Sequence, residues 1–331
     1  MTSFAQHRPA PASAATSDRA IAAAYNQAGD RYLAYADGDA ERLFAFDGRY
    51  SYGDRQIWDL LDTRLRAHFV AGAQTVRILD LGCGPGTWLR RIVTRARELG
   101  YRHIIARGID IAEDQVRRAR QLSAALNRLR GVDLTFEAGS ICEPLAEADG
   151  SVDLCLCLCG VLNHLSANDL PPLLSEIRRV TRGDFITTVR AVGSPPSVYV
   201  GAIEDARKFH QDHEKNRLEV EFQNGRRISM SSHLYNDAEL RALVSPHLAI
   251  KDIFGLDLFH GRFADDSRWN PNDRQRPAQF CAELDRLERI YCRDRGFIDH
   301  AAHLLLVGMP HRKGSACQAG FPIALAEVAA T

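Results

Sequence analysis

The stretch that decides the fold is ILDLGCGPGTW, residues 78–88. Its aliphatic run carries the acid Asp80, and Gly82, Gly84 and Gly86 follow at alternate positions. Glycines at such a turn adopt dihedral angles that are closed to other residues, and they let a ligand approach the backbone. The helix expected after the turn begins with free N–H groups beside the same place. The pattern therefore predicts a strand–turn–helix unit that binds a ligand at the turn.

The spacing of the glycines distinguishes this turn from the turn of dinucleotide-binding folds. That fingerprint, G-x-G-x-x-G, would require glycine at position 87, where this chain has Thr87. A carboxylate two residues before the turn would also repel a pyrophosphate. The acid Asp80 instead favours a ligand that carries a positive charge.

Strand-like and helical segments alternate around this turn. Five short apolar runs occur at VRILDLG, HIIARGID, VDLTFEA, VDLCLCL and DFITTVR. Helical patterns separate them, at WLRRIVTRARELG, EDQVRRARQLSAALNRL and DLPPLLSEIRRVTR. Such alternation predicts parallel βαβ units with helices on both faces of the sheet. We therefore expect a three-layer α/β sandwich around a Rossmann-like, mostly parallel sheet of seven strands, which two late strands close as an antiparallel pair.

The flanking segments have other patterns. The expected parts are a disordered leader, an N-terminal helical cap, a main domain and a flexible tail, at residues 1–17, 18–73, 74–310 and 311–331. Inside the main domain, Asn224-Gly225 lies between two extended runs and predicts a hairpin. We expect this hairpin insertion, around 195–235, to act as a lid that covers the site together with the cap.

Composition excludes several classes of protein. The 331 residues include 42 basic and 42 acidic side chains, so the balanced charge gives no sign of a nucleic-acid partner. The start lacks the pattern of a signal peptide, and no apolar run approaches the roughly 20 residues that span a bilayer. The sequence predicts a cytoplasmic protein without a membrane partner. Cys155, Cys157 and Cys159 alternate along one run, which favours core packing over a disulfide or a metal site, and we expect no metal.

The glycine turn, the order of strands and helices, and a second acid together carry a resemblance to a known family. In RGIDIA, Asp110 follows Gly86 by 24 residues. From about Val76 to Gly193, and more weakly to Met309, the chain resembles the class I S-adenosylmethionine (SAM)-dependent methyltransferases.

This resemblance implies a set of cofactor residues. The glycine loop, with Asp80, would hold the methionine part of SAM, and Asp110 with Ile111 would hold the ribose. In EAGSICEPL, Ser140 stands where many relatives have Asp, so Ser140 or the backbone of Ile141 would contact the adenine. Gly160, after the fourth strand, would lie beneath the sulfonium.

Residues just after the fourth and fifth strands are the candidates for chemistry, because ligands of open α/β sheets bind beyond the carboxyl ends of the strands. Asn163, His164 and Tyr199 are predicted as catalytic, with His164 either a general base or a packing residue. Arg190 is predicted to bind substrate, by gripping a carboxylate, or else to pair with an acid of the cap.

Tyrosines are frequent on the elements expected to fold over the cofactor. An aromatic face next to a sulfonium gains about 0.5–2 kcal/mol from the cation–π interaction. The alternative is that these rings fill core, and we retain Tyr25 and Tyr199 as site residues. The five tyrosines concerned are Tyr25, Tyr32, Tyr50, Tyr52 and Tyr199.

The expected function is SAM-dependent O- or N-methylation of a small metabolite, by in-line attack on the sulfonium methyl group, in specialised metabolism. A homodimer is an open expectation. Two alternatives remain. The segments CGVLNHL and HGRFADDSRWNP, with the loop that contains Tyr199, are similar to those of enzymes that cyclise SAM to azetidine-2-carboxylate and release methylthioadenosine. The other alternative is a non-catalytic SAM-binding protein, whose pocket would lack polar groups near the sulfonium.

Overall fold

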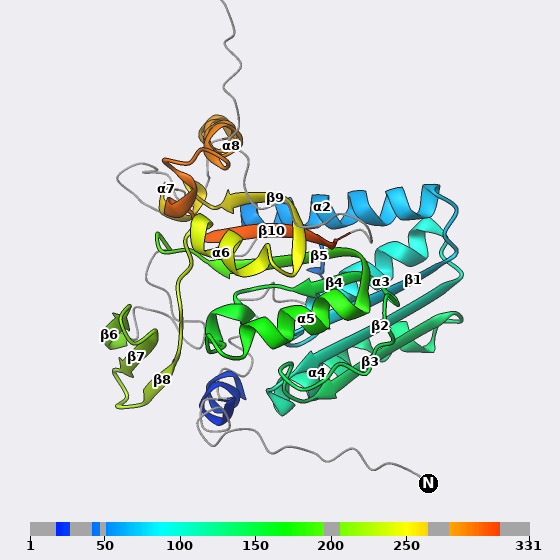
Figure 1. Ribbon diagram of the computed structural model, residues 1–331, viewed down its shortest axis with the longest axis horizontal. Coiled ribbons are helices and arrows are strands. Elements are labelled where there is room, and N and C mark those ends of the chain that lie inside the picture. Colours follow the sequence, from blue (N-terminus) through cyan, green and yellow to red (C-terminus); the bar gives the residue numbers. More distant parts are fainter. Residues whose placement is uncertain (1–17, 27–41, 47–50, 195–205, 264–277, 312–331) are drawn as a thin grey trace, which may run out of the picture.

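The computed structural model describes residues 18–26, 42–46, 51–194, 206–263 and 278–311. Its centre is a seven-stranded sheet of order β3-β2-β1-β4-β5-β10-β9 (Figure 1). The strands are β1 (Thr75–Leu81), β2 (His103–Asp110), β3 (Val132–Ala138), β4 (Val152–Cys157), β5 (Thr181–Arg190), β9 (Leu248–Leu256) and β10 (His303–Pro310). The first five are parallel to one another, and β10 pairs antiparallel with both β5 and β9. The predicted fold class is confirmed.

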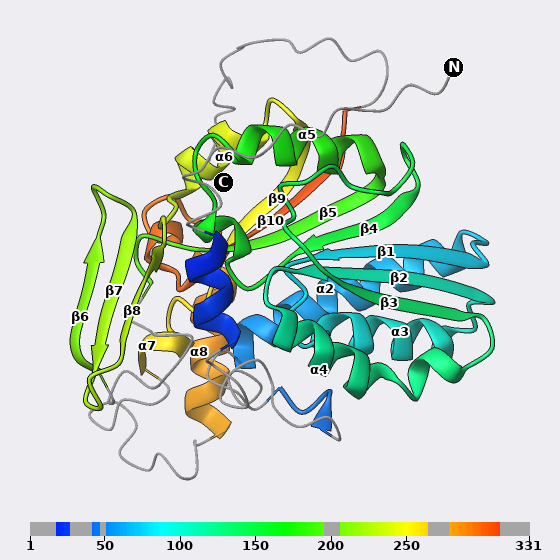
Figure 2. The ribbon, with the colours of Figure 1, turned by 90° about the horizontal axis from the view of Figure 1, so that it is seen from below.

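Helices cover both faces of the sheet, as Figure 2 shows. Buried side chains of α2, α3 and α4 pack with one face, and those of α5 and α6 pack with the other. These helices are α2 (Ser51–Val70), α3 (Thr87–Leu99), α4 (Glu113–Ser123), α5 (Leu170–Val180) and α6 (Asp237–Val244). Beyond β9 lie α7 (His260–Phe263) and α8 (Ala278–Tyr291). None of the described helices combines the length and the apolar character needed to cross a membrane.

One helix ends earlier than its pattern suggested. The periodicity extends to Leu129, but α4 ends at Ser123 and a short 3-10 turn, η2 (Leu126–Arg128), follows. Asn127 Oδ1 accepts a hydrogen bond of 3.0 Å from the Leu134 backbone N–H, which ties this turn to β3. The chain therefore leaves the helix in order to enter the next strand.

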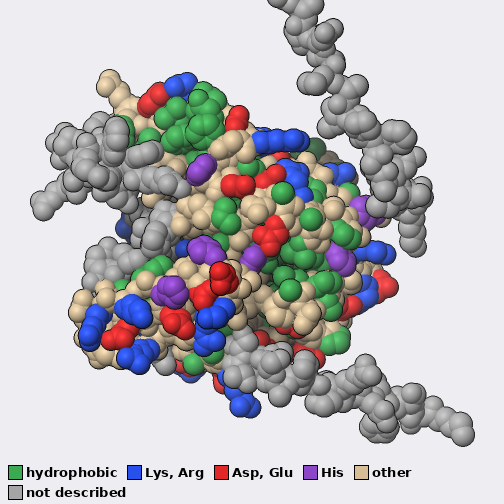
Figure 3. All heavy atoms as spheres, turned by 60° about the vertical axis from the view of Figure 1, so that its left-hand side comes forward, with side chains coloured by type: hydrophobic (Ala, Val, Ile, Leu, Met, Phe, Trp, Pro, Cys, Tyr) green, Lys and Arg blue, Asp and Glu red, His purple; other side chains and the backbone are tan. Residues whose placement is uncertain are grey.

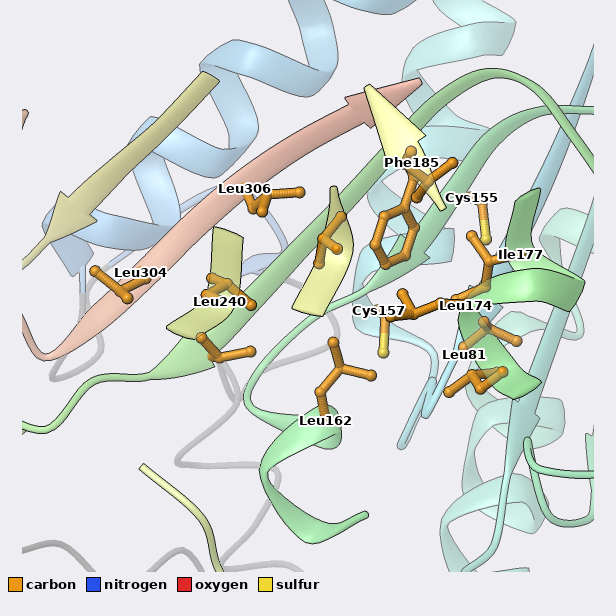
Figure 4. Packing of buried hydrophobic residues seen from close by; sticks show 14 of the residues in the cluster. Leu81, Cys155, Cys157, Leu162, Leu174, Ile177, Phe185, Leu240, Leu304 and Leu306 are labelled. Atoms are coloured by element: carbon orange, nitrogen blue, oxygen red, sulfur yellow. The ribbon is translucent and has the colours of Figure 1, made fainter. Parts of the chain in front are cut away.

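The larger core on the α5 side contains the cysteine run of β4. Cys155 and Cys157 are fully buried among aliphatic side chains and Phe185 (Figure 4). Burial raises the pKa of both thiols well above the usual range. Core packing is confirmed for these two cysteines. Cys159 lies past the end of the strand and has a positive φ of 58°.

The two described helices of the predicted cap take different positions. In α2, Leu61 and Leu65 are buried in the core cluster on the α3 side of the sheet. The helix of residues 18–26 lies instead at the carboxyl end of the parallel strands (Figure 2). This second helix is the part of the predicted cap that lies close to the candidate site.

The predicted hairpin belongs to a small separate sheet of order β6-β7-β8. Its strands are β6 (Ala206–Asp212), β7 (Arg217–Phe222) and β8 (Arg227–Ser231), all antiparallel. Gly225 in the β7–β8 turn has φ 79°, as the Asn-Gly pair predicted. The strand β6 was not predicted, and its burial does not alternate. Acidic and basic side chains are interspersed over this part of the surface (Figure 3), as in the Arg227–Glu221 ion pair of 3.1 Å.

Candidate functional site

The glycine turn after β1 is closely packed. Gly82, Gly84 and Gly86 all have positive φ, at 77°, 51° and 78°. A Cβ atom on Gly82 would lie 2.2 Å from Cγ2 of Val161, so glycine is required there by contact as well as by conformation. Gly86 is the N-cap of α3, and a Cβ on it would lie 2.7 Å from the ring of Phe136. The turn thus holds the start of α3 against β3 and the segment that follows β4.

Asp110, the last residue of β2, is fixed by two backbone groups. Its Oδ2 accepts from Gly84 N–H and its Oδ1 accepts from Ala112 N–H, both at 2.8 Å. A carboxylate has about four acceptor positions, so two remain for a ligand. Burial raises the pKa of Asp110. Asp80 is buried beneath it, and burial together with the charge of Asp110 raises the pKa of Asp80 to about 7.

A partly open cavity lies beside this turn. Its walls are mainly apolar, and they come from the glycine turn, the end of β2, the segments that follow β3 and β4, and the helix 18–26. The lining residues are Asp18, Ile21, Tyr25, Gly82, Gly84, Asp110, Ile111, Gln115, Gly139, Ser140, Ile141, Cys159, Val161, His164 and Leu165. Of the residues predicted to bind cofactor, Asp80, Gly86 and Gly160 are not in this lining.

The helix 18–26 forms the roof of the cavity, and two neighbours hold it. On one side it joins a small hydrophobic cluster with the three-stranded sheet. The buried members are Ile21, Ala24, Leu218, Val220, Phe222, Ile228 and Met230. On the other side, Gln115 Nε2 donates to the Tyr25 carbonyl at 3.0 Å, and the Asp114 N–H donates to Asn26 Oδ1 at 3.1 Å. The roof is therefore fastened to both the small sheet and α4.

Tyr25 and His164 form a hydrogen-bonded pair inside the cavity. His164 ends the 3-10 turn η3 (Val161–His164), and its Nδ1 lies 2.7 Å from the carbonyl oxygen of Ser231 in β8. A carbonyl only accepts, so Nδ1 carries a proton and donates it. Burial, with a contribution from Arg190, lowers the pKa of His164 and favours the neutral ring. Nε2 then accepts from the Tyr25 hydroxyl at 2.9 Å.

A second polar pair lies in the same lining. Ser140 Oγ donates to Asp18 Oδ2 at 3.2 Å and accepts from the Cys142 N–H at 3.4 Å. Burial raises the pKa of Asp18. Asp18 was not predicted as a site residue, because a single acid at the start of an amphipathic helix gives no sign of a binding role.

Residues 78–184 match the family model described as "Methyltransferase domain". Residues 78–184 form a class I methyltransferase domain. The cofactor of this family is SAM.

The chain also matches a curated protein, the probable methyltransferase ltbC of Aspergillus luteorubrus, at 35% identity over 120 residues. The match covers 35% of this chain and 40% of ltbC. The chain thus spans less than half the length of that curated relative.

The chain also matches solved structures at low identity. The [4+2]-cyclase SpnF matches with a TM-score of 0.51 and 16% identity, over 91% of this chain and 97% of SpnF. The PH0226 protein from Pyrococcus horikoshii OT3 matches with a TM-score of 0.46 and 17% identity, over 77% and 91% of the respective chains. At these identities the matches concern the fold of the methyltransferase domain and nothing beyond it.

The predicted catalytic role of Asn163 stays a prediction, and the structure shows how its side chain is held. Asn163 is 1% exposed and does not line the cavity. Its Nδ2 donates to the carbonyls of Arg190, at 3.2 Å, and of His233, and its Oδ1 accepts from the Arg190 N–H at 2.9 Å. Since both amide hydrogens are donated to backbone carbonyls, Asn163 positions η3 against the end of β5.

Gly160 and Arg190, which were predicted as cofactor-binding and substrate-binding residues, both lie near Asn163. Gly160, with φ 79°, is the N-cap of η3. Arg190 is buried beside Asn163, and its Nε and Nη2 lie 3.3 and 3.2 Å from Ser194 Oγ. Its substrate-binding role stays a prediction.

Of the five tyrosines named in the sequence, Tyr25 lines the cavity and Tyr52 does not. Tyr52 is buried and stacks on His260 at 4.7 Å between ring centroids, so it fills core. Tyr199, Tyr32 and Tyr50 lie outside the described residues.

Proposed function

We propose that the protein transfers the methyl group of SAM to an O–H or N–H group of a small molecule, with Tyr25 and His164 removing the proton. The observation that supports this most directly is the neutral His164, which is hydrogen-bonded to Tyr25 in the same cavity as Asp110 and the glycine turn. A protein that only bound the cofactor would not need a base and a hydroxyl group there.

The residues present suit SAM. The two acceptor positions left on Asp110 match the two ribose hydroxyls, and the backbone of Gly82 and Gly84, which lines the cavity, suits the methionine part. When bound, SAM supplies a methyl group on a sulfonium, with the neutral thioether as leaving group.

The proton route follows from the fixed tautomer of His164. Because Nδ1–H is committed to the Ser231 carbonyl, Nε2 is the basic atom and faces the Tyr25 hydroxyl. Tyr25 accepts the proton of the incoming O–H or N–H group as its own proton passes to Nε2. The resulting imidazolium keeps its hydrogen bond to Ser231. General-base catalysis of this kind contributes roughly 10²–10⁴-fold in rate.

The test is a product assay by mass spectrometry. Purified protein is incubated with SAM alone, and then with SAM and a panel of phenols, alcohols and amines, and the adenosine products are measured. We expect S-adenosylhomocysteine only when an acceptor is present. In His164→Ala its formation should fall roughly 10²–10⁴-fold, since the base is lost. The control is His213→Ala, which removes an exposed histidine outside the cavity lining.

The same assay separates the alternatives. Methylthioadenosine formed from SAM alone would contradict methyl transfer and would indicate intramolecular cyclisation to azetidine-2-carboxylate. Bound but unchanged SAM with every acceptor would favour a non-catalytic SAM-binding protein. Equal rates in the His164→Ala variant and the His213→Ala control would remove His164 from the chemistry.

A further inference from the structure

The cavity contains a carboxylate that the proton route leaves without a role. Asp18 lines the wall together with Ser140 and Gln115, and the side chains of Ile111 and Ile141 belong to the same lining. Among the described residues, Ser140 is the one hydrogen-bond donor to Asp18, through Oδ2. Asp18 Oδ1 therefore has acceptor capacity toward a ligand.

The charges around Asp18 determine the kind of ligand atom that it can meet. Asp169 and Glu143 both act on Asp18 as negative charges. Gln115 is 1% exposed, and its Oε1 has no hydrogen-bond partner in the described part of the chain. This part of the cavity is thus rich in acceptors, and it favours a hydrogen-bond donor over an anion or a carbonyl oxygen.

The position of the ribose then places the base of the cofactor. This step rests on the proposed function, in which Asp110 holds the ribose and the glycine turn holds the methionine part. The nucleobase is attached to the ribose and must therefore lie on the side opposite the glycine turn. That side of the cavity is lined by the residues that follow Asp110 and β3. Ile111 and Ile141 there offer apolar surface to a flat ring, while Asp18 and Ser140 offer polar atoms to its edge.

We infer that Asp18 accepts a hydrogen bond from the 6-amino group of adenine and makes the site selective for adenosine over inosine. The 6-amino group is a donor, whereas the 6-oxo group of inosine is an acceptor and would face a carboxylate. Asp18 is therefore a specificity-determining residue of the cofactor site, supplied by the roof helix rather than by the sheet.

This assignment also links cofactor recognition to the proton route. Asp18, Ile21 and Tyr25 stand at i, i+3 and i+7 of one helix, and all three line the cavity. These spacings lie on one face of a helix of 3.6 residues per turn. A ligand held by Asp18 thereby fixes the helix that presents Tyr25 to His164.

The test compares two ligands by titration calorimetry, S-adenosylhomocysteine and S-inosylhomocysteine. The wild-type protein should bind the adenosine compound roughly 10- to 100-fold more tightly, as expected for one hydrogen bond to a charged group. Asp18→Ala should lose most of this preference. Asp18→Asn, which keeps the side-chain shape, should reduce or invert it, because an amide can donate to the 6-oxo group. Asp114→Asn, on α4 outside the lining, is the matched control.

A rescue variant distinguishes recognition from a structural role. Ser140→Asp in the Asp18→Ala background returns a carboxylate to the other member of the pair and should restore the preference for adenosine. If Asp18 only braced the helix, its loss would weaken both ligands alike and leave their ratio unchanged, which would overturn the inference. Equal binding of both ligands by the wild-type protein would overturn it too and leave the proposed function standing. Binding of neither ligand would instead contradict the proposed function, and this inference with it.

Discussion

The two walls of the cavity are built in different ways. The wall at the glycine turn is local, since the Asp110–Gly84 hydrogen bond joins residues 26 apart in the chain. The roof depends on distant segments, with 139 residues between Tyr25 and His164 and 122 between Asp18 and Ser140. Short loops form the wall at the glycine turn, whereas the roof forms only when helix 18–26 and the small sheet have docked.

The two walls should also differ in how easily they open. The turn belongs to the large cores of the sheet, while the roof packs in a small separate cluster. Segments with few buried apolar contacts open at lower free energy than the core around them. We therefore expect the turn to stay formed while the roof opens to admit and release ligands.

The largest effect should come from Gly82→Ala. Its Cβ would lie 2.2 Å from Val161, and its φ of 77° is unfavourable for alanine. We expect the free energy of unfolding to fall by about 2–5 kcal/mol, measured by urea denaturation. The matched control is Gly225→Ala, which has φ 79° but nothing within 4 Å, so it should cost only about 1–2 kcal/mol. Equal losses would mean that contact with Val161 does not matter.

A smaller and more local effect should follow from Leu218→Ala in the small sheet. Leu218 is fully buried against the roof helix, so its truncation should cost about 2–3 kcal/mol. Hydrogen exchange should accelerate in residues 18–26 and 206–231, while the strands of the large sheet stay protected. Uniform acceleration throughout the chain would show that the roof and the turn unfold as one unit.

Per pH unit, the smallest effect should be a pH dependence at the turn. Because the pKa of Asp80 is about 7 in the native protein and 3.8 as an unperturbed group, the native state holds the proton more tightly. Stability from this group is complete below pH 4 and is lost as pH rises to 7. In Asp80→Asn that loss is absent, so the variant should gain on the wild type by at most about 1.4 kcal/mol per pH unit.

Urea titrations at pH 5, 6, 7 and 8 measure this gain. The difference between variant and wild type should grow up to pH 7 and then level off. A difference that is constant across the four pH values would contradict the assignment to Asp80.

Much of the fold could be predicted from local patterns. Apolar runs and helical periodicity located the five parallel strands of the large sheet. The cap of α6 is equally local, since Asn236 Oδ1 accepts from Glu239 N–H at 2.8 Å. The strand β6 could not be found, because its burial follows from pairing with β7 and not from an alternating sequence.

The cavity lining was predicted at the glycine turn, and at the roof for Tyr25 and His164 but not for Asp18. Gly82, Gly84 and Asp110 follow from the motif, because turn geometry and strand ends are local properties. Asn163 follows the fourth parallel strand, as a residue near the site should, but its amide group donates to the backbone carbonyls of Arg190 and His233. The expectations of a cytoplasmic location, a homodimer, and no metal or nucleic-acid partner stay predictions.

The sequence by itself determined the sheet, the glycine turn and the acid that ends β2, since each depends on residues close together in the chain. Tertiary structure alone decided which atom of His164 is basic, through the Ser231 carbonyl, and which tyrosine meets it. It also decided that Asp18 shares a wall with Ser140. These contacts join segments whose meeting depends on how the small sheet docks, and no local pattern encodes that.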